Sequence, residues 1–242
     1  MTKQLYHENS YLKEFDAVVT DVEKGINGVV LDRTAFFPGG GGQPPDFGVI
    51  ETEGTKLHIE RAKRHKGDIF HLIDEGGSLP DVGNKVQGKI NWPHRYELMR
   101  THTAMHILCG VIWSDYEVSV TGADMEPLKG RMDFEFETMQ KSLINSIEQA
   151  INVEVRNERP VSWRKLPREE AFQIPDLIRT KINLLPDHIQ QVRVVEIKGL
   201  DLQADGGTHV KNTSEVGEIN IYDYKSKGKM NKRIYFELGN EG

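Results

Sequence analysis

The chain has 242 residues, enough for one large domain or two small ones. With 31 lysines and arginines against 37 aspartates and glutamates, its formal net charge is −6, so any contact with nucleic acid must be local. A single cysteine excludes an internal disulfide framework, and no apolar run approaches the ~20 residues of a membrane span. Because residues 1–19 lack the apolar core of a secretory signal, we expect a chain that is mature from Met1 and cytoplasmic.

The first third of the chain, from Glu14 to about Gly88, alternates apolar and polar residues in short runs. The runs read DAVVTDVE, NGVVLDRTAFF, GVIETE, KLHIERA and DIFHLIDE, and glycine and proline clusters separate them. This pattern is typical of a small antiparallel sheet or barrel. We therefore predict an all-β part over residues 1–90.

A long helix is predicted next. Asn91 and Pro93 supply a cap and a first-turn proline for the stretch HRYELMRTHTAMHILCGVIW, whose apolar residues recur at helical spacing. A glycine break at Gly122, a strand RMDFEFE and a second helix capped by Thr138 are expected to follow.

Beyond residue 152 the pattern returns to strands. The expected strands are NVEVRNERPVSWRKL, QVRVVEIK, EVGEINIYDY and KRIYFEL, with a short helix starting at Pro167. The fold class predicted for the whole chain is α+β, with an α+β part over residues 91–242.

Two histidines of the long predicted helix lie at positions suited to a metal ion. His102 and His106 are four residues apart, so both rings lie on one face of the helix, about one turn from each other. Thr103 follows His102 where a helical HExxH protease has glutamate, which excludes that class in its usual form. The alternative is a pair of half-buried histidines bonded to backbone carbonyls.

A second pair of ligand types occurs in the sequence ADGGTH. Asp205 and His209 are also four residues apart, but the two glycines between them favour a loop after the strand QVRVVEIK. Three histidines and one carboxylate are an acceptable ligand set for zinc, at about 2.0 to 2.2 Å per ligand atom. These spacings indicate a site for one Zn²⁺ ion at His102, His106, Asp205 and His209.

Four consecutive glycines, Gly39 to Gly42, precede Gln43. Such a run is tolerated where the backbone turns sharply or approaches another group closely. It is neither a Walker loop nor a dinucleotide-binding motif, because the lysine and the glycine spacing of those motifs are missing. The motif by itself favours a structural hairpin over a ligand loop.

Basic residues concentrate in two short segments, where we predict contacts with nucleic acid phosphates. Tyr222, Tyr224 and Tyr235 lie near the second segment as possible stacking surfaces. The alternative for either segment is a solvated hairpin tip. The residues are Arg61, Lys63, Arg64 and Lys66 in the first segment and Lys225, Lys227, Lys229, Lys232 and Arg233 in the second.

Taken in order, the motifs TAFFPGGGGQPPDFG, RTHTAMHIL and ADGGTHV resemble the editing region of alanyl-tRNA synthetase and its freestanding relatives, the AlaX family of alanyl-tRNA editing proteins. The resemblance spans residues 34–210 and implies a glycine-motif β-barrel domain over residues 1–90. A zinc-binding two-layer α/β editing domain, similar to those of threonyl- and alanyl-tRNA synthetases, would occupy residues 91–242. Because 242 residues leave no room for an aminoacylation domain, we expect the medium-length form, acting in trans.

The resemblance also implies residue roles. Gln43 would contact the aminoacyl end of the substrate, and Thr103 and Thr208 are hydroxyl candidates for discriminating its side chain. The family usually has cysteine where this chain has Asp205, so a carboxylate stands where a softer thiolate is expected. Asp205 would then either bind the metal or hold a water.

The implied activity is zinc-dependent hydrolysis of mischarged alanine tRNA carrying serine or glycine. Two alternatives stay open: a zinc-stabilised tRNA-binding module without turnover, and a metallohydrolase of another aminoacyl or acyl ester.

Overall fold

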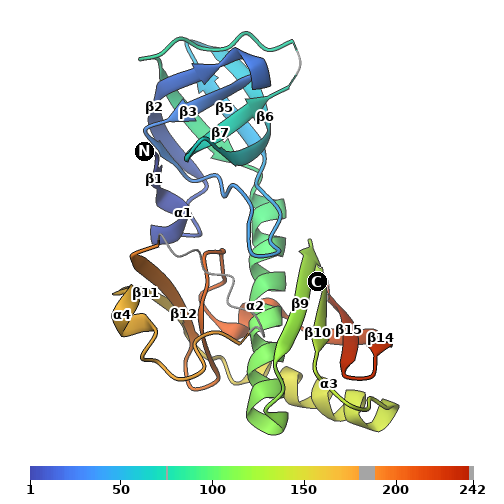
Figure 1. Cartoon of the computed structure of the whole chain (residues 1–242). Coiled ribbons are helices and arrows are strands. Elements are labelled where there is room, and N and C mark those ends of the chain that lie inside the picture. Colours follow the sequence, from blue (N-terminus) through green and yellow to red (C-terminus); the bar gives the residue numbers. More distant parts are fainter. Residues whose placement is uncertain (75, 180–188, 240–242) are drawn as a thin grey trace. The chain divides into compact units, whose positions relative to one another are not determined.

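The computed structural model describes residues 1–74, 76–179 and 189–239. The chain divides into two compact units, Met1–Tyr96 and Glu97–Gly242, and each is described by itself (Figure 1). Among the described residues, no helix combines the length and the apolar character needed to cross a membrane.

The first unit is a closed barrel of six antiparallel strands, which confirms the predicted barrel (Figure 1). Around the barrel the order is β2 (Glu14–Glu23), β3 (Gly28–Leu31), β7 (Asp68–Ile73), β6 (Thr55–His65), β5 (Gly48–Thr52) and β8 (Lys85–Ile90). Short elements complete the unit: β1 (Lys3–Gln4), α1 (Leu5–Glu8), η1 (Lys24–Ile26) and β4 (Arg33–Thr34). Inward residues of the strands pack with Phe36 and Phe37 to form the core.

Strand β8 closes the barrel by pairing with β2, and the sequence did not predict it. Its inward positions are Val86, Gly88 and Ile90, so a glycine interrupts the apolar alternation. The ring of Phe15, opposite Gly88 in the ladder, occupies the space that a Cβ would need: an added Cβ would lie 2.4 Å from it. The strand is therefore set by a contact with another strand, which local pattern does not reveal.

The predicted long helix is α2 (Trp92–Tyr116). Asn91 caps it as expected, because its Oδ1 accepts a hydrogen bond of 3.1 Å from the His94 N–H. Leu98, Leu108 and Ile112 are fully buried, as the apolar spacing predicted.

The second unit combines helices with two antiparallel sheets, so the predicted α+β class is confirmed (Figure 1). The first sheet has the order β14 (Ile219–Gly228), β15 (Asn231–Leu238), β10 (Lys129–Phe134), β9 (Val120–Glu126). The second has the order β11 (Val161–Pro167), β12 (Gln191–Ile197), β13 (Asp201–Ala204). The remaining elements are α3 (Lys141–Arg156), α4 (Arg168–Ala171) and η2 (Thr213–Val216).

Three local predictions in this unit were wrong. Gly122 is not a break, because it lies within β9 opposite Asp133 of β10. Thr138 does not cap the second helix, which begins at Lys141. Residues 152–156 continue α3 instead of forming a strand, because Val155 extends the buried helical row that includes Ile151. Packing of that row outweighs the weak strand preference of the valines.

Candidate metal centre

Helix α2 carries the first two residues of the centre. His102 and His106 lie one turn apart, with ring centroids 5.2 Å from each other, and their exposed fractions are only 4% and 7%. The other two residues come from the loop that follows β13, where Asp205 and His209 flank the two glycines. This segment is a loop, as the sequence predicted.

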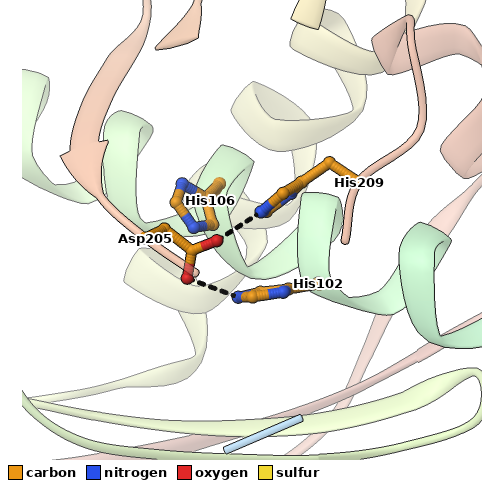
Figure 2. Close-up of side chains that lie close together, drawn as sticks. All are labelled: His102, His106, Asp205 and His209. Atoms are coloured by element: carbon orange, nitrogen blue, oxygen red, sulfur yellow. Dashed lines mark hydrogen bonds and ion pairs between the residues drawn. The ribbon is translucent and has the colours of Figure 1, made fainter. Parts of the chain in front are cut away.

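The four side chains converge on one point (Figure 2). One ligand atom from each of His102, His106, Asp205 and His209 lies within 4.8 Å of the others. The two carboxylate oxygens of Asp205 face different rings: Oδ2 lies 2.8 Å from Nε2 of His209, and Oδ1 lies 3.5 Å from Nε2 of His102. Residues predicted from two separate motifs therefore form one cluster.

The protonation states of this cluster favour a cation. Burial holds the pKa of His102 well below its usual range and lowers that of His209 to about 4, so both rings are neutral near pH 7. Burial alone would raise the pKa of Asp205, but the neighbouring His102 and His209 outweigh it, and the pKa lies well below its ordinary value. Neutral imidazoles and an ionised carboxylate are the forms that bind zinc, so His102, His209 and Asp205 fit this metal as donors.

Hydrogen bonds from surrounding residues orient the ligands. Nδ1 of His106 lies 2.8 Å from Oδ2 of Asp201, a contact that leaves Nε2 available to a metal. Burial opposes protonation of His106, but the bond to Asp201 prevails and raises its pKa. The backbone N–H of Gly207 donates to Oδ2 of Asp205 at 2.8 Å, which fixes the carboxylate.

Thr103 supports the other side of the centre. Its fully buried hydroxyl donates to the Met99 carbonyl at 2.9 Å, accepts from the Val210 N–H at 3.3 Å and lies 3.3 Å from Nδ1 of His209. The hydroxyl thus joins α2 to the loop that carries His209. Thr208, the second predicted hydroxyl, is also fully buried.

Cys109 is buried one turn beyond His106 and is not part of the converging group. Burial raises the pKa of its thiol, so the side chain stays protonated and acts as a small apolar group.

The glycine run forms a tight turn in the first unit. The backbones of Gly40 and Gln43 bond to each other twice, with both N–H to carbonyl distances 3.0 Å. The intervening Gly41 and Gly42 have φ values of +60° and +88°, which a residue with a Cβ rarely adopts. The backbone of the glycine run therefore forms the structural hairpin that the motif predicted. Gln43, at the end of the run, is buried, with 3% of its surface exposed.

The predicted basic segments differ in how many of their charges are engaged. In the second segment, Lys232 is buried and donates to the carbonyls of Gly228 and Lys229. The guanidinium of Arg233 donates two hydrogen bonds to the carboxylate of Asp133. In the first, Lys66 lies 2.6 Å from Glu23 and Arg64 donates to Gln4 and Tyr6. Lys225 of the second segment also pairs with Asp223, at 2.9 Å. The exposed residues Arg61, Lys63, Lys227 and Lys229 remain as candidates for phosphate contacts.

Curated relatives match this chain from end to end. The alanyl-tRNA editing protein AlaX-M of Saccharolobus solfataricus is 42% identical over 240 residues, which cover 98% of this chain and 99% of the relative. The chain belongs to the AlaX family of alanyl-tRNA editing proteins. The AlaX-M of Methanosarcina barkeri is 38% identical over 98% of this chain and 99% of its own length.

Larger proteins contain the AlaX region as a part. The AlaX-L of Pyrococcus horikoshii is 35% identical over 99% of this chain, which spans 58% of that relative. The family described as "tRNA synthetases class II (A)" matches residues 3–94, and the "Threonyl and Alanyl tRNA synthetase second additional domain" matches residues 192–235. The second match includes all but the first residue of β12, the whole of β13 and the loop with Asp205 and His209.

Sequence reasoning missed Asp201 and Arg193. Arg193 donates to the backbone carbonyl of Asp205 at 3.0 Å and lies 3.7 Å from its carboxylate. Both missed residues lie on short paired strands, and their partners are visible only once the strand register is known. The one available signal was for Arg193, a charged residue among the three valines of the strand QVRVVEIK.

Proposed function

We propose that this AlaX-family chain hydrolyses the ester of mischarged alanine tRNA in trans, with one Zn²⁺ ion at the candidate metal centre. Serine is the expected misattached amino acid, and glycine is the second candidate. The observation that carries the proposal is the convergence of His102, His106, Asp205 and His209 in a chain that matches AlaX-M proteins over nearly their full length. Action in trans is supported by the AlaX-M relative, an editing protein that this chain matches over 99% of the relative's length.

The four residues would hold the zinc ion, which supplies Lewis-acid chemistry: activation of a water or orientation of the substrate's amino group. Asp201 keeps His106 in the tautomer that presents Nε2, and Thr103 fixes His209. Both contacts order the site before substrate arrives, so less free energy is lost in ordering it during the reaction.

Rejection of alanine is the demanding part of this function. A pocket that hydrogen-bonds the serine hydroxyl leaves polar groups unpaired when alanine enters, and such sites discriminate strongly. Thr208 is the proposed hydroxyl contact. The Thr103 hydroxyl is already bonded to the Met99 carbonyl and the Val210 N–H, so it is proposed to act by holding His209. Gln43 is proposed to contact the aminoacyl end. The exposed basic residues of both segments are proposed to contact the tRNA backbone, in the cytoplasm.

A deacylation assay with Ser-, Gly- and Ala-charged alanine tRNA tests the proposal. We expect hydrolysis of the serine ester, little hydrolysis of the alanine ester, and loss of both activity and bound zinc in His102→Ala. Tight tRNA binding without turnover would support the binding-module alternative. Hydrolysis of acyl esters without a preference for tRNA would support the other hydrolase.

A further inference from the structure

Trp163 is an exposed aromatic residue on an edge strand close to the metal centre. It lies on β11, which pairs with β12 on one side. Of its surface, 39% is exposed, whereas most large apolar residues of the described chain are buried. Tryptophan contributes a large apolar surface, so its exposure beside a candidate site needs a reason.

Strand register places Trp163 on the face of the sheet that carries the centre. Trp163 is opposite Val195, and Lys165 is opposite Arg193. Side chains alternate between the two faces of a sheet, so Trp163, Lys165 and Arg193 share one face. Asp201, the partner of His106, lies opposite Ile197 and therefore on the same face.

One guanidinium group links the ring to the metal ligands. The Cζ atom of Arg193 lies 5.5 Å from the centroid of the Trp163 ring. The Nη1 atom of the same side chain lies 3.7 Å from Oδ2 of Asp205 and donates to the Asp205 carbonyl at 3.0 Å. The indole is thus one side chain away from the position where the ester would be cleaved.

The substrate has a matching dimension. In an aminoacyl-tRNA the ester is carried by the ribose of the terminal adenosine, so one sugar separates the reacting carbonyl from the adenine ring. With the ester at the metal centre, the adenine would lie one sugar away from the centre. The Trp163 ring lies one side chain, that of Arg193, away from the same centre, so the two rings would be near each other. Aromatic side chains bind unpaired bases by stacking, and neighbouring cations bind the phosphates.

We propose that Trp163 stacks on the terminal adenine of the tRNA and that the exposed Lys165 beside it contacts the adjoining phosphate. This inference rests on the proposed function and names the residue that positions its substrate. Arg193 is not a contact in this proposal, because it holds Asp205 in place.

A binding experiment with uncharged alanine tRNA tests stacking without chemistry. Two RNAs are compared, one ending in CCA and one that lacks the terminal adenosine, and each is titrated at fixed salt. For the complete RNA, Trp163→Ala should weaken binding by about 5-fold to 150-fold, the range of base–aromatic stacking. For the shortened RNA it should change nothing, because the base that it stacks on is missing.

Two variants keep the test selective. Trp163→Phe retains an aromatic ring and should restore most of the affinity for the complete RNA. Phe172→Ala is the matched control: Phe172 is also exposed (43%) and also has a cation, Arg168, 4.7 Å from its ring centroid. It should bind both RNAs as the unchanged protein does. Zinc content and thermal unfolding should be the same in all variants.

Equal weakening of both RNAs by Trp163→Ala would overturn the inference, because the effect would not depend on the adenine. No weakening of either would overturn it as well. The proposed function is judged separately: if the unchanged protein deacylates Ser-charged tRNA, that function holds whatever Trp163 does. With the charged substrate, Trp163→Ala should raise KM by a similar factor and leave kcat nearly unchanged.

Discussion

Asp201 and His106 form a buried hydrogen bond between Oδ2 and Nδ1 at 2.8 Å, although they are 95 residues apart in the chain. Carboxylates in this position fix the orientation of a metal-binding histidine, and their loss typically costs 10-fold to 100-fold in metal affinity.

Asp201→Asn should therefore weaken zinc binding by about 10-fold to 100-fold. Competition with a chelator of known affinity measures this. In a His106→Gln background the same change should have no further effect, because the bond is already absent. An additive loss in the double variant would show that Asp201 acts by another route. Gln203→Ala, which removes the other donor to Oδ2, is the matched control and should affect zinc less.

Asp205 should behave as a direct metal ligand. Asp205→Cys should keep the metal and bind it more tightly, because a thiolate is a softer ligand for zinc. Asp205→Ala should lose more zinc affinity than Asp201→Asn does, because it removes a ligand atom. Zinc stoichiometry and deacylation rate are measured together. Unchanged zinc affinity in Asp205→Ala would contradict the assignment.

Gln43→Ala should lower the deacylation rate markedly while zinc content and Tm stay near those of the unchanged protein. The reason is that the turn is shaped by the backbones of Gly40 and Gln43 and by glycines with positive φ, none of which the substitution removes. If Tm falls in step with activity, the side chain has a structural role instead.

At the base of the same loop, by contrast, substitutions should lower the stability of the folded protein. Asp46 and Arg95 form a fully buried ion pair, and Asp46 also accepts the Phe37 N–H at 2.6 Å. Removing one partner leaves a buried charge, so Asp46→Asn or Arg95→Met should cost about 3 to 5 kcal/mol in the free energy of unfolding.

Denaturant unfolding of the zinc-loaded protein measures this cost. The double variant should lose less than the sum of the single losses, because neither charge then remains unpaired. Lys89→Met, in the exposed pair that Lys89 forms with Glu14, is the control and should change stability little.

His71 should make the barrel less stable in acid. Its ring lies in the core, where Nδ1 donates to the Val29 carbonyl at 3.2 Å and Nε2 accepts from the Thr34 hydroxyl at 2.7 Å. Burial lowers its pKa from 6.5 to about 4. Between these values the unfolded chain binds the extra proton and the folded chain does not, so stability falls as pH is lowered through this window.

The loss should reach about 3 kcal/mol over the whole window. His71→Gln, which can keep both hydrogen bonds, should remove that part of the pH dependence. His58→Gln alters an exposed histidine of the same barrel and should leave it in place. Identical pH profiles for all three proteins would contradict the prediction.

The sequence by itself determined features that depend on neighbouring residues. The i, i+4 spacing put His102 and His106 on one helix face, the glycines marked the turn before Gln43 and the loop after Asp205, and alternation indicated the barrel strands. These signals are local, because the period of a helix or strand is fixed by backbone geometry.

Only the tertiary structure decided which distant residues meet. Strand β8 depends on Phe15 filling the space above Gly88, and the end of α3 depends on packing of its apolar row. The bond from Asp201 to His106 depends on the register of β13 against β12 and on its placement beside α2. Such contacts are fixed by long-range packing, and one sequence carries no local signal for the register that sets them.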